Sequence, residues 1–254
     1  MSLFELTGKK AFITGASRGI GQAIAVALAQ AGADVALVAR GPDGLAETAS
    51  AVEAAGRQAF VIPADVTSQE QVAGAVSAAI GQLGYVDIVV NNAGGSNFMV
   101  DFKDLRLAGW DKIMQLNLNS AVYVCHAFAD HLLERGQGSV INVASVAGVV
   151  SAPTMSPYGA AKAGLISLSK TLAVEWGAGG VRVNALCPGW TATALNRNLW
   201  ADPDLGPARV AGVPLRRWAR AEEMAGPAVF LASAASSYMT GQVVVVDGGQ
   251  TIAP

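Results

Sequence analysis

The chain has 254 residues, of which 52% are hydrophobic and 14% are charged, which suits one large domain with a sizeable core and excludes an intrinsically disordered chain. The formal net charge is −2, and lysine and arginine form no dense run, so nucleic acid is not an expected partner. Abundant glycine and alanine favour buried parallel strands covered by closely packed helices.

Apolar runs of strand length alternate with helix-length segments along the chain. This alternation is typical of βαβ units, which build a parallel sheet with helices on both faces. Seven strands are predicted at Lys10–Thr14, Asp34–Ala39, Ala59–Pro63, Val86–Asn91, Ser139–Val143, Val181–Leu186 and Gln242–Val246. Helices are predicted at Ile20–Ala31, Gly44–Ala55, Gln69–Leu83, about Trp110–Arg135, Pro157–Gly177 and Ala221–Ala232. We therefore expect a single Rossmann-type, doubly wound α/β domain over residues 1–254.

The first strand runs into a glycine-rich turn that opens a helix, Thr14-Gly15-Ala16-Ser17-Arg18-Gly19-Ile20-Gly21. Glycines let the backbone approach a pyrophosphate closely, and the helix N-terminus favours the negative charge. The spacing is one residue longer than the usual dinucleotide fingerprint, and a purely structural turn is the alternative. The strand-turn-helix context favours phosphate binding by Gly15, Ser17, Arg18, Gly19, Ile20 and Gly21.

The second strand ends at Ala39-Arg40, where a fold that prefers NAD presents a carboxylate to the ribose hydroxyls. The missing acid leaves room for a 2′-phosphate, with which Arg18 and Arg40 could pair. Each arginine alone could equally be a solvated surface side chain. Together with the missing acid, the two arginines predict NADP(H) as the cofactor. The third and fourth predicted strands end at the same edge, with Asp65-Val66 and Asn91-Asn92-Ala93-Gly94.

A phenol and an ammonium group lie four residues apart in Ser156-Pro157-Tyr158-Gly159-Ala160-Ala161-Lys162, at the start of a predicted helix with Ser156 as its N-cap. Residues at this spacing share a helix face, so the lysine should favour the phenolate of Tyr158. Lowering a tyrosine pKa from about 10 to about 7 needs roughly 4 kcal/mol. One charge at about 5 Å supplies roughly 3 kcal/mol, so a second positive charge is needed. Read alone, the pair could be a solvated helix face.

The segment from Pro188 to Arg220 is the long irregular stretch of the sequence. It follows the predicted carboxyl end of a strand, where ligands bind in open α/β sheets. We therefore expect a substrate lid at about residues 190–218, the alternative being a poorly ordered insertion.

Metal, membrane and secretion signals are not visible in the sequence. His126 and His131 share a helical segment without a nearby cluster of ligands, so no metal site is expected. Cys125 and Cys187 lie in apolar segments, which is typical of buried free thiols. The apolar stretch from Gly21 to Ala39 is too interrupted for a membrane span. The first residues lack a basic segment before an apolar core, and a cytoplasmic location is expected.

Taken in order, these motifs are similar to those of the short-chain dehydrogenases/reductases of the Tyr-x-x-x-Lys type. The resemblance covers essentially the whole chain. It rests on Thr14-Gly15-x-x-x-Gly19-x-Gly21, Asp65-Val66, Asn91-Asn92-Ala93-Gly94, Asn117, Ser145, Tyr158 with Lys162, Pro188-Gly189 followed by Thr193, and Asp247-Gly248-Gly249. It implies hydride transfer between NADP(H) and a carbonyl compound or secondary alcohol, without a metal.

The resemblance also implies the role of each residue. Tyr158 acts as the acid or base, Ser145 hydrogen-bonds the substrate oxygen, and Lys162 binds the nicotinamide ribose. The oxidised ring supplies the second positive charge beside Lys162, and Asn117 distorts its helix and holds a water that links the lysine to solvent. Further cofactor contacts are implied for Asp65, Val66, Asn92, Ala93, Gly94, Tyr158, Lys162, Pro188, Gly189, Thr191 and Thr193. The resemblance also implies a homotetramer, in which the helix that carries Tyr158 and the long helix before it form one interface and the C-terminal segment forms a second.

The small-molecule substrate is expected to be a medium-sized, partly hydrophobic carbonyl compound or the matching alcohol, because the segments around the site are apolar and aromatic. A 3-oxoacyl thioester and a sugar acid or polyol are the alternatives. Gly95-Ser96-Asn97-Phe98 departs from the Thr-Arg-Asp that thioester reductases of the family usually carry at this place. A non-catalytic NADP(H)-binding sensor or scaffold is the alternative function, against which the intact set of Asn117, Ser145, Tyr158 and Lys162 argues.

Overall fold

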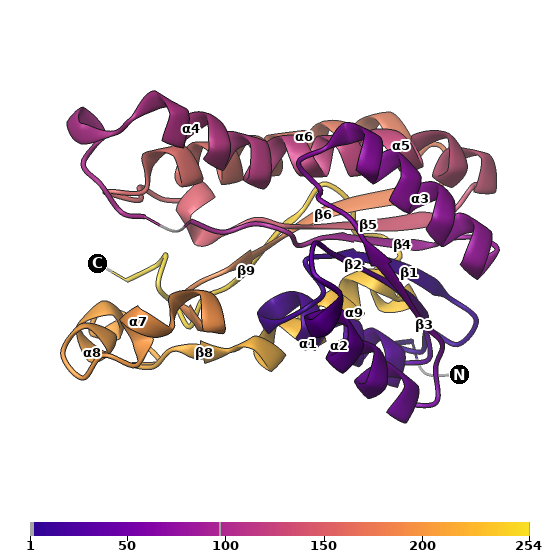
Figure 1. Cartoon of the computed structure of the whole chain (residues 1–254), viewed down its shortest axis with the longest axis horizontal. Coiled ribbons are helices and arrows are strands. Elements are labelled where there is room, and N and C mark those ends of the chain that lie inside the picture. The colour runs from indigo at the N-terminus through magenta and orange to yellow at the C-terminus, as the bar shows by residue number, and fades with distance from the viewer. Residues whose placement is uncertain (1–2, 97, 254) are drawn as a thin grey trace.

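A computed structural model describes residues 3–96 and 98–253. At its centre lies a seven-stranded sheet of order β3-β2-β1-β4-β5-β6-β9, in which every pair of neighbours is parallel (Figure 1). The strands are β1 (Lys10–Thr14), β2 (Asp34–Ala39), β3 (Ala59–Pro63), β4 (Ile88–Asn91), β5 (Gly138–Val143), β6 (Val181–Pro188) and β9 (Val243–Val246). The predicted α/β fold with seven parallel strands is therefore confirmed.

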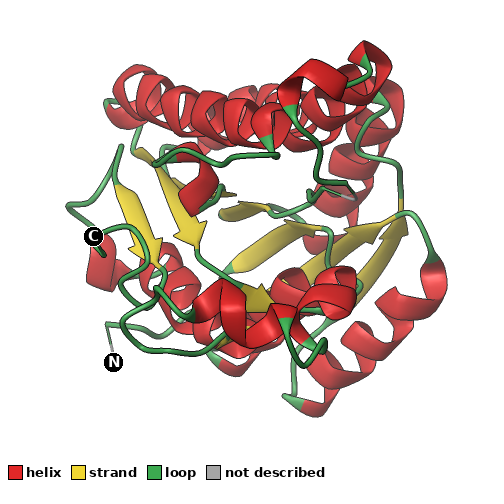
Figure 2. Cartoon of the chain, turned by 90° about the vertical axis from the view of Figure 1, so that its left-hand side faces the viewer, coloured by secondary structure: helices red, strands yellow, loops and turns green. Residues whose placement is uncertain are grey.

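Helices cover both faces of the sheet, and Figure 2 shows the two helical layers with the strands between them. One layer holds α1 (Gly19–Gln30), α2 (Pro42–Ala54) and α9 (Ala225–Ala232). The other holds α3 (Gln69–Leu83), α4 (Leu107–Met114), α5 (Ser120–Arg135) and α6 (Ser156–Gly177). The chain winds from β1 outward to β3 and then returns to β4 on the other side of β1. The connections diverge at this switch point, which leaves room for a ligand at the carboxyl ends of β1 and β4.

The strands are apolar on both sides because each side faces a separate core. In β1, Ile13 belongs to the cluster formed with α1, α2 and α9, whereas Phe12 belongs to the cluster formed with α3, α5 and α6. The Phe12 ring meets the Phe128 ring edge-on, with centroids 4.9 Å apart. This two-sided burial explains the near-continuous apolar runs that mark the strands in the sequence.

Two buried carboxylates fix the edge of the sheet opposite the carboxyl ends of the strands. Asp34, at the start of β2, pairs with Lys10 and with Arg57, whose Nη2 lies 2.7 Å from the carboxylate. Asp87, just before β4, pairs with Arg135 at 3.1 Å. Because their charges are compensated by these cations, the two buried acids can hold neighbouring segments together at the amino ends of the strands. The expected ligand site lies at the opposite, carboxyl ends.

The structure differs from the sequence prediction at the starts of several helices. Three of them, α1, α2 and α9, begin at Gly19, Pro42 and Ala225, whereas the predicted starts are Ile20, Gly44 and Ala221. The helix expected over about Trp110–Arg135 begins at Leu107 and is interrupted by a π-helix at Gln115–Asn119. The N-cap of α6 is Met155 and not Ser156, because the Met155 carbonyl already accepts the bond from Gly159 N at 2.9 Å. Ser156 is the first helical residue, and its buried hydroxyl has no hydrogen-bond partner among the described residues.

The irregular segment after β6 has more regular structure than the sequence indicates. It contains β7 (Thr191–Ala192), which pairs in parallel with β8 (Ala219–Arg220), and the short helices α7 (Arg197–Trp200) and α8 (Leu205–Val210). Figure 1 shows the helices α7 and α8 together at one end of the molecule. None of the helices in the described ranges is both long and apolar enough to cross a membrane.

Candidate active site

The glycine-rich turn after β1 is a backbone cradle that side chains would fill. Gly15 and Gly19 have positive φ angles of 66° and 60°, which favour glycine. A Cβ at Gly15 would come within 2.8 Å of Asn92 Nδ2, and one at Gly21 would collide with the Gly15 carbonyl. The turn therefore opens α1 with its backbone exposed to a ligand, as the sequence predicts for a phosphate site.

Thr14 and Asn92 hold this turn against the end of β4. The Thr14 hydroxyl accepts hydrogen bonds from the backbone N–H groups of Asn92 and Ala93, at 3.0 and 3.1 Å. The Asn92 amide donates in return to the carbonyls of Thr14 and Gly15, at 3.0 and 3.1 Å. Asn92 thus positions the phosphate turn. Sequence reasoning named Asn92 as a cofactor contact at this edge but not as the residue that holds the turn, because no local pattern shows which segment its side chain would contact.

Two arginines are available near the expected adenosine end. Arg18 and Arg40 are exposed, and neither forms an ion pair within the part of the chain that the structure describes. Asp65 accepts hydrogen bonds from Thr67 N and Oγ1, at 2.9 and 2.8 Å. These bonds and the nearby Arg40 charge hold the pKa of Asp65 below its usual range, although burial opposes them. No acid occupies the end of β2 itself, so Arg18 and Arg40 could both attract a phosphate there.

Ser145, Tyr158 and Lys162 come together where β5 ends and α6 begins. Ser145 lies just past β5 and caps a 3₁₀ turn at Val146–Gly148 by accepting from Ala147 N at 3.1 Å. Lys162 is 3% exposed, and its Nζ donates to the carbonyl of Val143 at 2.8 Å. The same Nζ lies 5.7 Å from the centroid of the Tyr158 ring. The helix therefore places the phenol and the ammonium group side by side.

Burial dominates the protonation of this pair in the structure. It raises the pKa of Tyr158, and a side-chain hydrogen bond with Ser145 opposes the rise only in part. Burial also lowers the pKa of Lys162 to about 8. The charge of Lys162 therefore does not bring the tyrosine pKa below its ordinary value in the chain without cofactor, and the sequence argument likewise required a second positive charge beside it.

Asn117 holds the loop after β4 on the side where that loop passes Lys162. It lies in the π-helix and is 1% exposed. Its amide accepts from Gly95 N at 2.8 Å and donates to the carbonyls of Gly95 and Ile113, at 2.9 and 3.0 Å. A Cβ on Gly94 would lie 2.7 Å from Asn117 Oδ1 and 3.1 Å from Lys162 Nζ, so Gly94 passes close to both side chains. The distortion of the helix at Asn117 agrees with the expectation from the sequence, and a π-helix is frequent at functional sites.

The loop after β6 closes the site from the other side. A Cβ on Gly189 would lie 2.7 Å from Asp247 Cβ, so the loop runs close to the end of β9. Asn196 holds it by accepting from Thr193 N and Oγ1, at 2.9 and 3.0 Å, and by donating to the Thr191 carbonyl at 2.9 Å. A Cβ on Gly19 would be 3.4 Å from Thr193 Cγ2, so this loop reaches the phosphate turn. Asn196 was missed in the sequence because its partners follow no periodic pattern.

Other predicted site residues are found as follows. Pro188 ends β6, Val66 follows Asp65 after β3, and Ser17 and Ile20 flank the turn at the start of α1. Cys125 and Cys187 are buried free thiols, as predicted. Burial raises the pKa of the Cys187 thiol to about 11, so it stays neutral beside Lys162. Asn97 of the predicted substrate loop lies outside the described residues.

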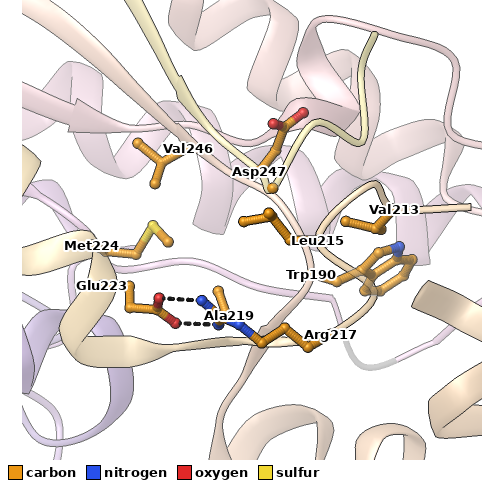
Figure 3. Close-up of a pocket in the computed structure, with 10 residues that line it drawn as sticks. Trp190, Val213, Leu215, Arg217, Ala219, Glu223, Met224, Val246 and Asp247 are labelled. Carbon is orange, nitrogen blue, oxygen red and sulfur yellow. Dashed lines mark hydrogen bonds and ion pairs between the residues drawn. The ribbon is translucent and has the colours of Figure 1, made fainter. Parts of the chain in front are cut away.

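A cavity of about 90 Å³ lies beside residues 190–218, the segment for which the sequence predicts a lid (Figure 3). Its lining comes from the lid, the turn before α9 and the end of β9: Trp190, Val213, Leu215, Arg217, Ala219, Glu223, Met224, Val246, Asp247 and Gly248. Arg217 forms a double ion pair with Glu223 at 2.7 Å for both contacts, drawn as dashed lines. None of Asn117, Ser145, Tyr158 and Lys162 lines it. The cavity therefore belongs to the base of the lid and not to the predicted reaction centre.

A glycine-rich turn open to a ligand, two exposed arginines and a tyrosine beside a buried lysine at the carboxyl ends of the strands fit a dinucleotide-dependent oxidoreductase. The model of the family described as "Enoyl-(Acyl carrier protein) reductase" matches residues 15–251. The chain belongs to the short-chain dehydrogenase/reductase family, as the motifs indicate, and it is an oxidoreductase of that family.

Curated relatives match over nearly the full chain. Gluconate 5-dehydrogenase of Gluconobacter oxydans is 39% identical over 250 residues, which are 98% of this chain and 97% of that protein. The rhamnolipids biosynthesis 3-oxoacyl-[acyl-carrier-protein] reductase of Pseudomonas aeruginosa is 41% identical over 255 residues, 97% of each chain. Among solved structures, a gluconate 5-dehydrogenase from Burkholderia cenocepacia in complex with NADP and tartrate is 36% identical, with a TM-score of 0.94 over 99% of this chain and 98% of that one.

Proposed function

We propose that the chain oxidises a secondary alcohol or reduces the matching carbonyl compound with NADP(H), using Tyr158 as the acid or base. This places it among enzymes that act on the CH–OH group with NADP⁺ as acceptor. The observation that carries the proposal is the contact between the Tyr158 ring and the buried Lys162 ammonium group, 5.7 Å from the ring centroid, beside Ser145.

The residues at the sheet edge fit the cofactor. The turn at Gly15, Gly19 and Gly21 would hold the pyrophosphate, since side chains there would fill the space or strain the backbone. Arg18 and Arg40 would bind the 2′-phosphate, and Lys162 the nicotinamide ribose. Further contacts would come from Ser17, Ile20, Asp65, Val66, Asn92, Ala93, Gly94, Tyr158, Pro188, Gly189, Thr191 and Thr193. When bound, the nicotinamide supplies or accepts the hydride.

The chain's own groups manage the proton. During reduction the Tyr158 hydroxyl donates its proton to the carbonyl oxygen, while the Ser145 hydroxyl hydrogen-bonds and positions that oxygen. The burial that raises the pKa of Tyr158 keeps it protonated and ready to donate. For oxidation the phenolate is needed, so positive charge must be added beside Lys162. Asn117, in contact with Gly94 and Gly95 beside the lysine, lies where a water could resupply the proton.

A sugar acid or polyol is the substrate class that we favour. Two groups of relatives carry names of sugar-acid enzymes, gluconate 5-dehydrogenase and 2-dehydro-3-deoxy-D-gluconate 5-dehydrogenase, the latter 35% identical over 250 residues in the Escherichia coli protein. A 3-oxoacyl thioester is the second class, because two relatives carry the name 3-oxoacyl-[acyl-carrier-protein] reductase. The Gly95-Ser96-Asn97-Phe98 sequence favours the first class over the second.

A screen of NADPH oxidation tests the function. Ketones, sugar keto acids and acyl thioesters would be supplied to the purified protein, and the absorbance of NADPH at about 340 nm would be followed, with NADH in parallel. We expect turnover of at least one sugar keto acid and a clear preference for NADPH. If NADPH binds but no carbonyl compound or alcohol is ever turned over, the protein is a sensor or scaffold and the proposal is wrong.

The cofactor preference should depend on Arg40. Arg40→Leu is expected to raise the KM for NADPH about 10- to 100-fold, because a charge-assisted hydrogen bond contributes about 1.5–3 kcal/mol. The KM for NADH should change little, since NADH has no 2′-phosphate. Initial rates with both cofactors measure the effect. A strong preference for NADH in the unmodified protein would contradict the roles of Arg18 and Arg40.

We further infer the homotetramer that the family resemblance implies. Exposed apolar side chains support an interface: Val122 and Leu133 lie on α5, and Val174 lies on α6. Light scattering on the purified protein would contradict the tetramer if it gave only the 25.8 kDa monomer. A cytoplasmic location stays a prediction of the sequence.

A further inference from the structure

Arg209 is a cation on the lid that faces the two loops bordering the reaction centre. It belongs to α8, and its guanidinium carbon lies 5.5 Å from the centroid of the Trp190 ring. Its Nη2 lies 3.7 Å from the sulfur of Met99. Trp190 directly follows Gly189 on the nicotinamide side, and Met99 lies on the loop after β4. The side chain therefore bridges the lid to both borders of the expected substrate site.

The lid holds Arg209 in this place through two indoles. Trp218 Nε1 donates to the Gly206 carbonyl of α8 at 2.8 Å, which fixes the helix that carries the arginine. The rings of Trp218 and Trp190 pack with centroids 5.2 Å apart. Ala219 N, next to Trp218, donates to the Trp190 carbonyl at 2.8 Å and holds the two tryptophans together. Because the guanidinium lies over a fixed ring, its orientation is restricted before a ligand arrives.

The Met99 side of this contact is connected to the reaction centre. Val100 N donates to the Thr154 carbonyl at 2.9 Å, just before the helix that carries Tyr158. At its other end the loop is held at Gly95 by Asn117. A Cβ on Gly95 would lie 2.6 Å from Leu195 Cδ2, so the lid also covers the loop there. A substrate entering between lid and loop would pass these residues.

Arg209 has unused capacity for an anion. No carboxylate lies within ion-pair distance of it in residues 3–96 and 98–253, whereas Arg217 and Arg220 of the same region both pair with Glu223. Its one side-chain acceptor is the Met99 thioether, which is a weak acceptor. The exposed guanidinium lies over the Trp190 ring and keeps donors in its own plane, where a carboxylate could bind with two hydrogen bonds.

We propose that Arg209 binds the carboxylate of the substrate, so that the lid selects hydroxy acids and their keto acids over neutral polyols and ketones. This inference rests on the proposed function, and it assigns the acidic member of the favoured substrate class. Arg209 is thereby a specificity-determining residue, while the proton chemistry stays with Tyr158.

Binding of a matched pair of probes tests the inference without turnover. D-gluconate and D-glucitol differ by a carboxylate against a hydroxymethyl group, and each would be titrated calorimetrically into the Tyr158→Phe protein saturated with NADP⁺. Arg209→Gln is expected to weaken gluconate binding about 10- to 100-fold and to leave glucitol binding unchanged. Arg209→Lys should retain part of the gluconate affinity, because it keeps the charge but loses the double hydrogen bond. Arg106→Gln is the matched control, an exposed arginine without a side-chain hydrogen bond or ion pair among the described residues, and should change neither affinity.

Two results would overturn the inference. One is a parent protein that binds gluconate no more tightly than glucitol. The other is an Arg209→Gln protein whose gluconate affinity is unchanged, or whose two affinities fall equally, since the residue would then only support the lid. The failure of the proposed function looks different. An unmodified protein that reduces only neutral ketones keeps the function and refutes the role of Arg209. An unmodified protein that binds NADPH but turns over no carbonyl compound or alcohol refutes the function, whatever Arg209 does.

Discussion

Tyr158→Phe is expected to lower kcat by about 10²- to 10⁴-fold, the range that a positioned acid or base contributes. The phenyl ring keeps the packing at the start of α6, so NADPH affinity and the thermal unfolding midpoint should stay near those of the parent protein. The loss follows because the hydroxyl beside Ser145 is the group that delivers the proton to the substrate oxygen. Steady-state kinetics and cofactor titration measure both quantities.

Tyr238→Phe is the matched control for this change, because Tyr238 is fully exposed. It removes the same hydroxyl from a tyrosine and should leave kcat unaltered. If Tyr158→Phe retained the activity of the Tyr238→Phe protein, Tyr158 would not be the acid or base.

Lys162→Met is expected to produce a protein that is more stable but nearly inactive. The change removes the attraction between the ammonium group and the Tyr158 phenolate, which is worth roughly 3 kcal/mol. The rate of alcohol oxidation should therefore fall about 100-fold. The KM for the cofactor should also rise, because the ammonium group is proposed to bind the nicotinamide ribose. Oxidation rates at several pH values should show the remaining activity shifted to higher pH.

The stability gain of Lys162→Met follows from the pKa of the lysine. In the folded chain that pKa is about 8, below its ordinary value of 10.5, so burying the charged form costs about 3 kcal/mol at neutral pH. The unfolded chain binds more protons between these two values, and the parent protein therefore gains stability as pH rises from 8 to 10.5. The Met variant should be about 1–3 kcal/mol more stable in urea unfolding at pH 7, after allowing for the unpaired Val143 carbonyl, and the difference should shrink toward pH 10. An equal difference at both values would contradict the lowered pKa.

The strands could be predicted closely because two-sided burial leaves an apolar run in the sequence. The first three strands match their predicted bounds, and β6 extends two residues beyond the predicted Leu186. The start of α6 could not be predicted as well. Ser156 has the side chain of a good N-cap, but the helix already begins to accept hydrogen bonds at Met155, and this depends on the loop from which the chain enters.

Site residues could be predicted where a backbone conformation requires a particular residue type. They could not be predicted where the site depends on contacts between segments that are distant in the sequence. Gly15 and Gly19 have positive φ angles, and a glycine-rich turn in the sequence already indicates such a backbone conformation. The contact of Arg209 with Trp190 and Met99 joins three segments whose spacing follows neither helix nor strand period. Short elements such as β7 and α7 have too few residues to show a period at all.

The protonation of Tyr158 shows a second limit. Sequence reasoning weighed the attraction between the phenolate and Lys162 but had no measure of burial, which raises the pKa of the tyrosine in the folded chain. With the free chain tuned for a protonated phenol, the enzyme is expected to favour carbonyl reduction near neutral pH and to need the added positive charge of the oxidised cofactor for the reverse reaction.

Transfer of deuterium from NADPH that carries deuterium in both hydrogen positions at C4 of the nicotinamide tests the central claim most directly. The carbonyl compound that the screen finds to be reduced fastest would be incubated with labelled NADPH and the protein, and the alcohol analysed by mass spectrometry. The account predicts one deuterium in each product molecule, on the carbinol carbon. An alcohol without deuterium, or consumption of NADPH without any alcohol, would contradict it.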